Sequence, residues 1–288
     1  MLRSLKTLNC AGKLLFLDKP AIMGILNLSP DSFYDGGRYD DIGTAVRQAV
    51  KMIEEGADII DIGGMSSRPG AEVIEPEVEK KRVIPVLKNL VASFPDNIFS
   101  VDTVHSSVAE AAIDAGAGMI NDISAWSIDP KLLDVIAESK VPYVLMHMQG
   151  KPKNMLNDTD YKDVQTDVLQ FFEEKLIQLQ SKDIFDIVVD PGFGFGKTVD
   201  QNYELLVNLS AFRVLGFPIL AGVSRKSMIW KTLNVKPDEA LNGTTALHMV
   251  ALEQGARILR VHDVAAASEV IKLRNKIKKA GGIIEPDF

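Results

Sequence analysis

The chain is poor in the features that mark several large classes of protein. Among its 288 residues there is one cysteine, Cys10, which excludes a disulfide framework within the chain and predicts a reducing, cytoplasmic location. No apolar run approaches the ~18 residues of a membrane span, and residues 1–7 lack the apolar core of a secretory signal, so no membrane partner is expected. The formal charge is −7 and no Lys/Arg run occurs, which argues against nucleic acid as a partner. An anionic small molecule stays possible, because local cations can oppose the global charge.

Linkers and shifts in composition are missing too, and one pattern repeats along the chain instead. A short aliphatic strand ends on a polar residue, and a loop and an amphipathic helix follow. The expected strand ends lie at residues 22–27, 59–64, 99–102, 119–123, 143–147, 187–190, 219–223 and 258–262. Helices are expected over residues 42–53, 77–91, 106–115, 130–137, 160–179, 238–254 and 265–280, with Gly56, Gly116 and Gly255 as C-terminal caps. Eight such units favour an α/β fold, a closed (β/α)₈ TIM barrel, over a doubly wound sheet, with residues 1–288 as a single domain.

Residues 9–18 precede the first barrel strand. Their run Leu14-Leu-Phe-Leu17 follows a Gly turn, which predicts a short N-terminal hairpin that plugs the bottom of the barrel.

The stretch from Ile187 to Lys197 joins an aliphatic strand to a turn of alternating Gly and Phe. Asp190 ends the strand, at the edge where α/β sheets place their chemistry. The spacing is not that of a P-loop, because the residue five before Gly196 is Pro191, and strictly alternating glycines do not match Gly-x-Gly-x-x-Gly either. Taken alone, the stretch is compatible with a catalytic acid or with an ordinary βα turn.

Polar residues gather at the other strand ends as well, around one predicted mouth: Asn27, Asp61, Asp102, Asn121, Asp122, His147, Asp190, Lys226, Arg260 and His262. Barrel interiors are normally filled by branched aliphatics, so this set indicates a ligand site, although Asp122 and Asp263 are also suited to cap helices. Asp102, Asn121, Asp190 and Lys226 would together pair with a flat heterocycle. Arg68, Arg260 and His262 form a cationic group suited to phosphate.

The metal-binding possibilities are narrowed by spacing. The first strand end lacks the His-x-His of zinc hydrolase barrels, and the four histidines (His105, His147, His248, His262) share no ligand spacing. His248 falls inside a predicted helix and is expected to pack, and Cys10 is too isolated for a nucleophile. The Asn27 amide oxygen is a hard ligand that suits Mg²⁺ bound to substrate phosphates. The Gly-, Pro- and Ser-rich loops 27–37 and 63–70 are expected to act as lids.

Several motifs, in order, resemble the dihydropteroate synthase family. They are Asn27-Leu-Ser-Pro-Asp-Ser-Phe33 with Asp35-Gly-Gly37, Asp61-Ile-Gly-Gly64 with Ser67-Arg-Pro-Gly70, Val101-Asp102, Ile120-Asn-Asp-Ile123, the stretch from Asp190 to Lys197, Ser224-Arg-Lys-Ser227 and Arg260-Val-His262. The resemblance covers nearly the whole chain. It implies a transferase of folate biosynthesis, a sulfonamide target, that joins 7,8-dihydropterin-6-ylmethyl diphosphate to 4-aminobenzoate and releases diphosphate. It also implies a homodimer, formed through the later helices.

The resemblance assigns roles to residues of this chain. The pterin would be held by Asp102, Asn121, Asp190 and Lys226, between walls of Ile123, Met146 and Phe195. The diphosphate would be held by Asn27, Ser67, Arg68, Arg260 and His262, with Asn27 as the Mg²⁺ ligand, and the 4-aminobenzoate site would be formed by Phe33, Pro69 and Ser227. The resemblance gives the catalytic role to Asp102, Asp190, Lys226, Arg260 and His262.

Two positions depart from the family pattern, and three alternatives stay open. Met65 stands where the family usually has an acid, and Trp230 where it usually has a small residue. A pterin-binding methyltransferase domain is one alternative, although it would not need Arg68, Arg260 and His262. A relative that binds pterin diphosphate without turnover is the second. Without the resemblance, the acids at the strand ends predict a Mg²⁺-dependent lyase.

Overall fold

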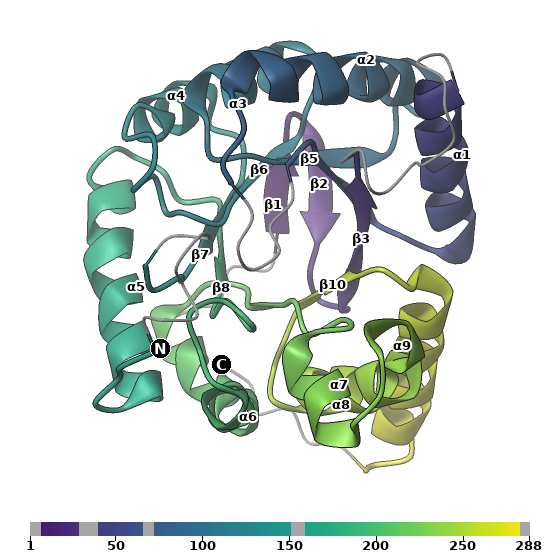
Figure 1. Cartoon of the computed structure of the whole chain (residues 1–288), viewed down its shortest axis with the longest axis vertical. Helices are drawn as coiled ribbons and strands as arrows, with labels where there is room; N and C mark the ends of the chain where they lie inside the picture. The colour runs from purple at the N-terminus through teal and green to yellow at the C-terminus, as the bar shows by residue number, and fades with distance from the viewer. Residues whose placement is uncertain (1–6, 29–39, 66–71, 151–158, 283–288) are drawn as a thin grey trace.

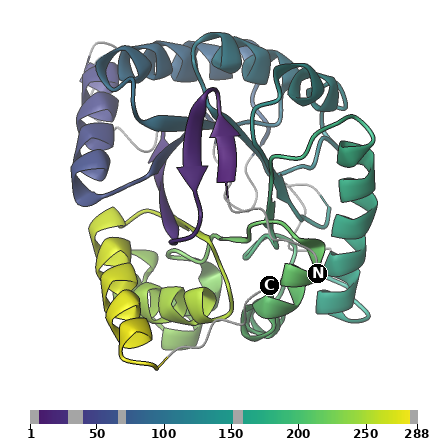
Figure 2. The same cartoon turned by 180° about the vertical axis from the view of Figure 1, so that it is seen from behind.

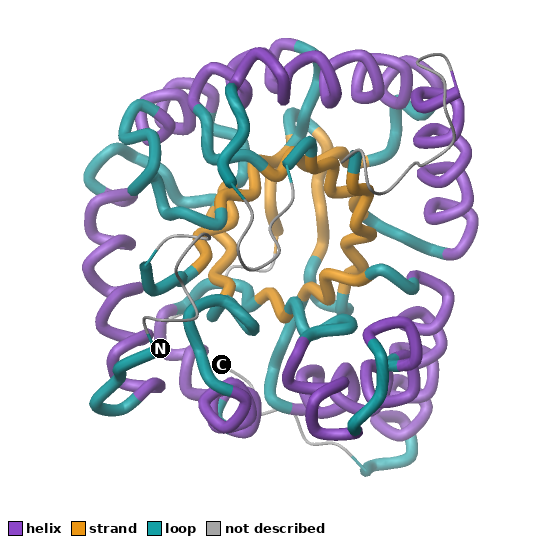
Figure 3. Tube along the Cα trace, in the orientation of Figure 1, coloured by secondary structure: helices purple, strands orange, loops and turns teal. Residues whose placement is uncertain are grey.

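Eight parallel strands form a barrel at the centre of the molecule. The computed structural model describes residues 7–28, 40–65, 72–150 and 159–282. The strands are β3 (Ala21–Asn27), β4 (Ile59–Gly63), β5 (Ile98–Asp102), β6 (Met119–Asp122), β7 (Tyr143–Met146), β8 (Ile187–Asp190), β9 (Leu220–Ala221) and β10 (Ile258–Val261). They are hydrogen-bonded in the order β8-β7-β6-β5-β4-β3-β10-β9, and a parallel bridge between Val189 and Ile219 brings β8 to β9. The expected (β/α)₈ barrel is therefore confirmed, and Figure 3 shows its strands as a ring inside the helices.

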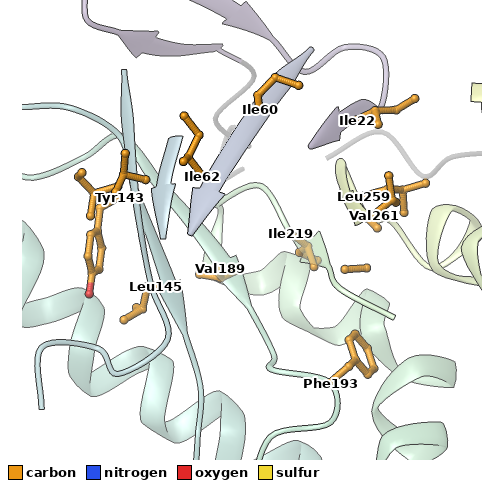
Figure 4. Packing of buried hydrophobic residues seen from close by; sticks show 14 of the residues in the cluster. Ile22, Ile60, Ile62, Tyr143, Leu145, Val189, Phe193, Ile219, Leu259 and Val261 are labelled. Atoms are coloured by element: carbon orange, nitrogen blue, oxygen red, sulfur yellow. The ribbon is translucent and has the colours of Figure 1, made fainter. Parts of the chain in front are cut away.

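The two faces of each strand explain the ring of helices around the barrel (Figure 1). Alternate side chains of a strand point to opposite faces. The outward residues are almost all aliphatic and belong to one large buried cluster with apolar residues of the helices; Figure 4 labels Ile60, Leu145 and Leu259 among its members. Burial of such side chains contributes about 1.5–3 kcal/mol each. The helices are thus held to the barrel by apolar contacts, and its interior at the carboxyl ends is left to polar residues.

The helices follow the strands in alternation. They are α1 (Asp40–Glu55), α2 (Pro76–Ser93), α3 (Ser106–Asp114), α4 (Leu132–Ser139), α5 (Val164–Gln180), α6 (Val199–Val207), α7 (Ser227–Leu233), α8 (Leu241–Glu253) and α9 (Val264–Lys279). The expected glycine caps are confirmed, since Gly56, Gly116 and Gly255 have φ values of 103°, 100° and 99°.

The structure differs from the sequence expectation in four places. Helix α5 begins four residues later than expected, because Asp163 caps it by accepting a bond from the Thr166 amide. A 3₁₀ turn at Pro237–Glu239 replaces the expected start of α8. The pattern did not single out α6, which a capping box at Thr198 begins, or the short α7.

The N-terminal hairpin closes the amino end of the barrel, as predicted. Strands β1 (Thr7–Cys10) and β2 (Lys13–Phe16) pair antiparallel, and Figure 2 shows them across that end. Leu8, Cys10 and Leu15 pack against the first inward residue of the barrel strands, such as Met119 and Val188. The carboxyl end is therefore the end at which a ligand can enter. No helix in the described parts of the chain is long and apolar enough to span a membrane.

Candidate active site at the carboxyl ends of the strands

The register of the barrel places the predicted polar residues on its inner wall. Asn27 of β3 pairs with Gly63 of β4, Gly63 with Asp102 of β5, and Asp102 with Asn121 of β6. Asp190 pairs with Met146 of β7 in the same way. Because paired residues of parallel strands point to the same face, these side chains line one surface at the mouth. For Asn27, Asp102, Asn121 and Asp190 the structure therefore shows the predicted convergence.

A guanidinium crosses the interior and ties three strands together. The Nε of Arg260, on β10, donates to Oδ2 of Asp61 at 2.7 Å, and its Nη2 donates to Oδ2 of Asp102 at 2.7 Å. The Nδ2 of Asn121 donates to the same Asp61 oxygen at 2.9 Å. Asp61 and Asp102 have side-chain exposures of 0% and 9%, so these ion pairs are shielded from solvent, and removal of one partner would leave a buried charge uncompensated.

The Arg260 guanidinium and the Asp102 carboxylate affect the pKa of one another. Burial raises the pKa of the Asp102 carboxyl, and the Arg260 guanidinium opposes that rise. The neighbouring carboxylates in turn raise the pKa of Arg260, so it stays protonated at every accessible pH. The cation is therefore permanent and held between acids, ready to meet an anionic group.

A second pair of charges lies across the mouth. Oδ1 of Asp190 accepts the Gly192 amide at 2.8 Å, and burial raises the pKa of Asp190 while Lys226 opposes the rise. Burial and the Arg260 charge lower the pKa of Lys226 to about 8. Its Nζ lies 4.2 Å from the centroid of the Phe195 ring, a cation–π contact. Acceptor, donor and aromatic face thus stand together, as recognition of a flat heterocycle requires.

An apolar cluster forms the wall beside these charges. Ile123, Met146 and Phe195, the three predicted pocket walls, pack together with Met65 and Val104. Each is at most 7% exposed. Met65, which replaces the family's usual acid, therefore extends the apolar wall. Trp230 is partly buried and packs against the main core, as expected of a local packing change.

His262 lies beside Arg260 at the mouth, partly surrounded by the wall and with part of its surface exposed to solvent. Its backbone amide donates to Ser224 Oγ at 3.2 Å, and that hydroxyl lies 3.1 Å from His262 Nδ1. The donor in this contact depends on the imidazole tautomer: when the hydroxyl donates to Nδ1, the imidazole proton stands on Nε2. Desolvation by the surrounding wall, then the charges of Arg260 and Lys226, lower the pKa of His262. The lowered pKa favours the neutral imidazole at pH 7, so we expect His262 to offer a hydrogen bond beside the charge of Arg260.

A buried lysine, Lys197, ends the stretch that begins at Ile187, and it had no predicted role. The Nζ of Lys197 donates to the carbonyls of Gly192 and Phe195 at 3.0 Å each, and lies 3.0 Å from Nδ1 of His147. Burial lowers its pKa to about 7, and burial lowers the pKa of His147 as well. Lys197 thus fixes the turn that carries Phe195. A Cβ at Gly192 would lie 1.9 Å from the His147 carbonyl oxygen, so glycine is required for this approach.

The two acids with an alternative prediction are also resolved. The Asp122 carboxylate accepts bonds from Ser124 and Trp126 amides and the Tyr143 hydroxyl, so it stabilises a turn outside the barrel wall. Asp263 stands at the start of α9 but makes no side-chain cap; it binds Arg225 through both oxygens, each at 2.8 Å. Neither carboxylate caps a helix: the residues after Asp122 form a turn, and α4 begins later, with Lys131 at its N-cap position.

Several predicted site residues lie outside the described residues: Phe33, Ser67, Arg68 and Pro69. Asp61 was named as a strand end but was given no role, and Ser224 only belonged to a motif. The only signal for them in the sequence was their position, because each is a polar residue at or next to the end of a barrel strand, where an apolar residue would be expected if it only filled the core. Within the described ranges no three His, Cys, Asp or Glu side chains gather as a metal site. The Asn27 amide oxygen lies near Asp102, since a Cβ at Gly63 would be 3.6 Å from that oxygen and from Asp102 Cβ.

Known proteins resemble the chain over nearly its whole length. A sequence profile described as pterin binding enzyme matches residues 23–262. The dihydropteroate synthase of Synechocystis sp. is 44% identical over 259 residues, which is 89% of this chain and 89% of that protein. The solved Xanthomonas albilineans dihydropteroate synthase with 4-aminobenzoic acid has a TM-score of 0.89 at 42% identity, covering 95% of this chain and 98% of that one. The Yersinia pestis dihydropteroate synthase with a sulfonamide drug complex has a TM-score of 0.89 at 41% identity, covering 95% and 99%.

Proposed function

The chain belongs to the dihydropteroate synthases of the pterin-binding enzyme family, and we propose that the side chains at its strand ends perform the reaction as follows. The enzyme joins 7,8-dihydropterin-6-ylmethyl diphosphate to 4-aminobenzoate and gives 7,8-dihydropteroate and diphosphate. The observation that carries the assignment of residues is the mouth itself. Charged and amide side chains for a heterocycle adjoin an apolar wall, and a fixed guanidinium lies next to them.

The pterin is held by Asp102, Asn121, Asp190 and Lys226. A pterin ring has an amine-bearing edge and a carbonyl, so it needs both acceptors and a cationic donor. Asp190 and Lys226 provide one of each, and Phe195 beneath Lys226 supplies a flat apolar face. Ile123 and Met146 in the same apolar cluster favour an aromatic ring over a flexible ligand.

The diphosphate is held by Arg260 and His262, with Asn27, Ser67 and Arg68 completing its site. Two of the five N–H donors of a guanidinium are used by Asp61 and Asp102, which leaves donors for phosphate oxygens. Neutral His262 adds an Nε2–H donor. Charge-assisted bonds of this kind stabilise the negative charge that develops as diphosphate leaves.

Mg²⁺ fits the residues at this side of the mouth. Mg²⁺ takes one or two oxygen ligands from the protein and completes its shell with water and substrate phosphates. The Asn27 amide oxygen, with the Asp102 carboxylate nearby, matches such a sparse set. When bound, the ion would neutralise charge on the departing diphosphate.

The bond that breaks joins the pterin's methylene carbon to the diphosphate oxygen. When diphosphate departs with the bonding electrons, the methylene carbon is left as a cation whose charge the pterin ring delocalises. The ionised carboxylates of Asp102 and Asp190 stabilise this cation. The amine of 4-aminobenzoate then attacks the methylene carbon and loses a proton. Phe33, Pro69 and Ser227 form the site for this second substrate. No covalent enzyme intermediate is required, and burial raises the pKa of the Cys10 thiol to about 12, which makes it a poor nucleophile.

The assembly is a homodimer formed through the later helices. Large apolar side chains are exposed there: Val207 is 55% exposed on α6, Leu233 49% on α7, Leu241 38% on α8 and Leu273 61% on α9. Where such side chains adjoin one another on neighbouring elements, they are suited to a protein interface. Residues 1–288 as one domain and a cytoplasmic location stay predictions from the sequence.

The direct test is release of diphosphate. Purified protein with Mg²⁺, pterin diphosphate and 4-aminobenzoate is expected to release diphosphate and form dihydropteroate in equal amounts.

Lys226→Ala and Asp190→Ala test the assignment of the pterin site. Each is expected to lower kcat/KM by 100-fold or more, a loss of transition-state stabilisation on the order of 3 kcal/mol, and to leave the unfolding transition in place. Near-normal rates in both variants would contradict the assignment of the pterin site. Tight pterin binding without diphosphate release in the unsubstituted protein would identify a non-catalytic relative.

A further inference from the structure

Asp61 is the buried acid on which the two halves of the site converge. We propose that Asp61 is a positioning residue: it sets the orientation of the Asn121 amide and of the Arg260 guanidinium, and so links the pterin end of the site to the diphosphate end. The inference rests on the proposed function, because it concerns how those two residues are presented to the substrate.

The place of Asp61 in the barrel excludes a direct role on substrate. It pairs with Ser100 of β5, whereas Gly63, the next inward residue of β4, pairs with Asp102. Asp61 therefore lies one layer below the rim, and it is 0% exposed. It can act on a ligand only through side chains that stand between it and the mouth.

Asn121 is the first of these side chains. An amide side chain presents an oxygen and an NH₂ group that occupy nearly the same shape, so its orientation must be set by a neighbour. The Asp61 oxygen that faces it also faces Arg260 and acts as an acceptor, so the Nδ2 of Asn121 is turned toward it at 2.9 Å. The Asn121 carbonyl oxygen is then turned away from Asp61. A ligand with a ring N–H meets an acceptor there, and one with a bare ring nitrogen does not.

Arg260 is the second. Its Nε binds Asp61 and its Nη2 binds Asp102, so two carboxylates hold the same edge of the planar group. Two bonds along one edge fix the plane of the Arg260 guanidinium, so the Nη1 donors on its other edge have a fixed direction toward the ligand. Asp102 is itself assigned to the pterin, so Asp61 is the partner that keeps Arg260 in place whether or not a pterin is bound.

The hydrogen bonding of Asp61 argues against a purely structural acid. Both of its donors use Oδ2, and Oδ1 is buried with no hydrogen-bond partner among the described residues. A buried carboxylate with one oxygen unsatisfied costs the fold free energy. Asp122 on β6 shows the contrast, because its two oxygens accept four bonds from Ser124, Trp126 and Tyr143.

The test is a set of double-mutant cycles read by calorimetric binding of two probes, pterin diphosphate and the pterin alcohol that lacks the diphosphate. Asp61→Asn is expected to weaken both, the alcohol about 10-fold and the diphosphate about 100-fold, because only the second also depends on Arg260. In an Asn121→Ala background, Asp61→Asn should no longer affect the alcohol. In an Arg260→Gln background, it should no longer affect the diphosphate more than the alcohol.

Asp122→Asn is the matched control. It also removes a fully buried aspartate close to Asp102, so it accounts for general loss of charge and of stability. It is expected to lower the stability to urea and to leave the ratio of the two affinities unchanged. Additive effects of Asp61→Asn with both partner substitutions, or an equal change of the ratio by Asp122→Asn, would overturn the inference while the proposed function stands. Failure of the unsubstituted protein to bind either probe would overturn both.

Discussion

The tautomer of His262 depends on its contact with a single hydroxyl. Ser224 Oγ accepts the His262 backbone amide and lies 3.1 Å from Nδ1, and we expect it to donate its own proton to that nitrogen. The imidazole then keeps Nε2–H as the donor that faces a phosphate. Desolvation and the flanking cations lower the pKa of the ring and so favour its neutral form, in which the other tautomer would present a lone pair to an anion. A serine next to the site therefore decides whether the histidine attracts or repels the substrate.

Ser224→Ala removes that direction and is expected to lower kcat/KM about five- to tenfold, which corresponds to one neutral hydrogen bond of about 1–1.4 kcal/mol. Steady-state kinetics with pterin diphosphate would measure it. Ser100→Ala is the control, because the Ser100 hydroxyl is also buried in the barrel but has no partner among the described residues. Equal kinetic effects of the two substitutions would contradict the tautomer argument.

At the scale of single elements, segments with a regular apolar pattern were predicted from the sequence, and short segments without such a pattern were not. All eight barrel strands were predicted, because an aliphatic run ending on a polar residue is a local signal. Helix α7 was not singled out: it has seven residues, and it begins directly from the loop that carries Lys226. The expectation that the Asp263 side chain caps a helix was wrong, because it binds Arg225 instead. Arg225 lies 38 residues away in sequence, so no local pattern could indicate this contact.

Helix α2 carries a buried acid close to the site. Glu79 is 0% exposed and accepts a bond from Thr103 Oγ1 at 3.0 Å, while its Oε1 has no partner in the described part of the chain. Burial raises its pKa to about 7 from 4.5; the Thr103 bond and Arg82 oppose the rise, and the Asp102 charge adds to it. The folded protein therefore binds this proton more tightly than the unfolded chain does. Stability from this group is full below about pH 4.5 and is lost as the pH rises through about 7.

Glu79→Gln removes the ionisation and keeps the shape. The variant is expected to be more stable than the unsubstituted protein at pH 8, by up to about 3 kcal/mol, and equally stable at pH 4.5. Urea unfolding at both pH values would measure the difference. Glu77→Gln on the same helix is the control, because the Glu77 side chain is 75% exposed and should give no change with pH. A Glu79→Gln benefit that is the same at both pH values would rule out the ionisation as its cause.

At the scale of the whole molecule, the site exists only because the barrel closes. Arg260 and Asp61 are 199 residues apart in sequence, and Arg260 and Asp102 are 158 apart. Sequence reasoning placed each of them at a strand end and so at one mouth, which is why the grouping was predicted. It could not tell which side chains bind one another, because pairing depends on register and depth in the barrel. Asp61 therefore received no role, and Arg260 was assigned to phosphate with no mention of the acids that hold it.

The opposite end of the barrel offers a test of how the closed ring is stabilised. Leu8 is 0% exposed and packs in the bottom cluster, while Leu14 on the same hairpin is 57% exposed. Leu8→Ala leaves a cavity between the hairpin and the strands and is expected to lower the free energy of unfolding by about 2–5 kcal/mol. Leu14→Ala, the matched control, should change it by no more than about 0.5 kcal/mol. Urea unfolding would measure both, and kcat/KM at 25 °C should stay unchanged, since the hairpin lies at the end away from the mouth. If Leu8→Ala were no less stable than Leu14→Ala, the hairpin would cover the barrel without stabilising it.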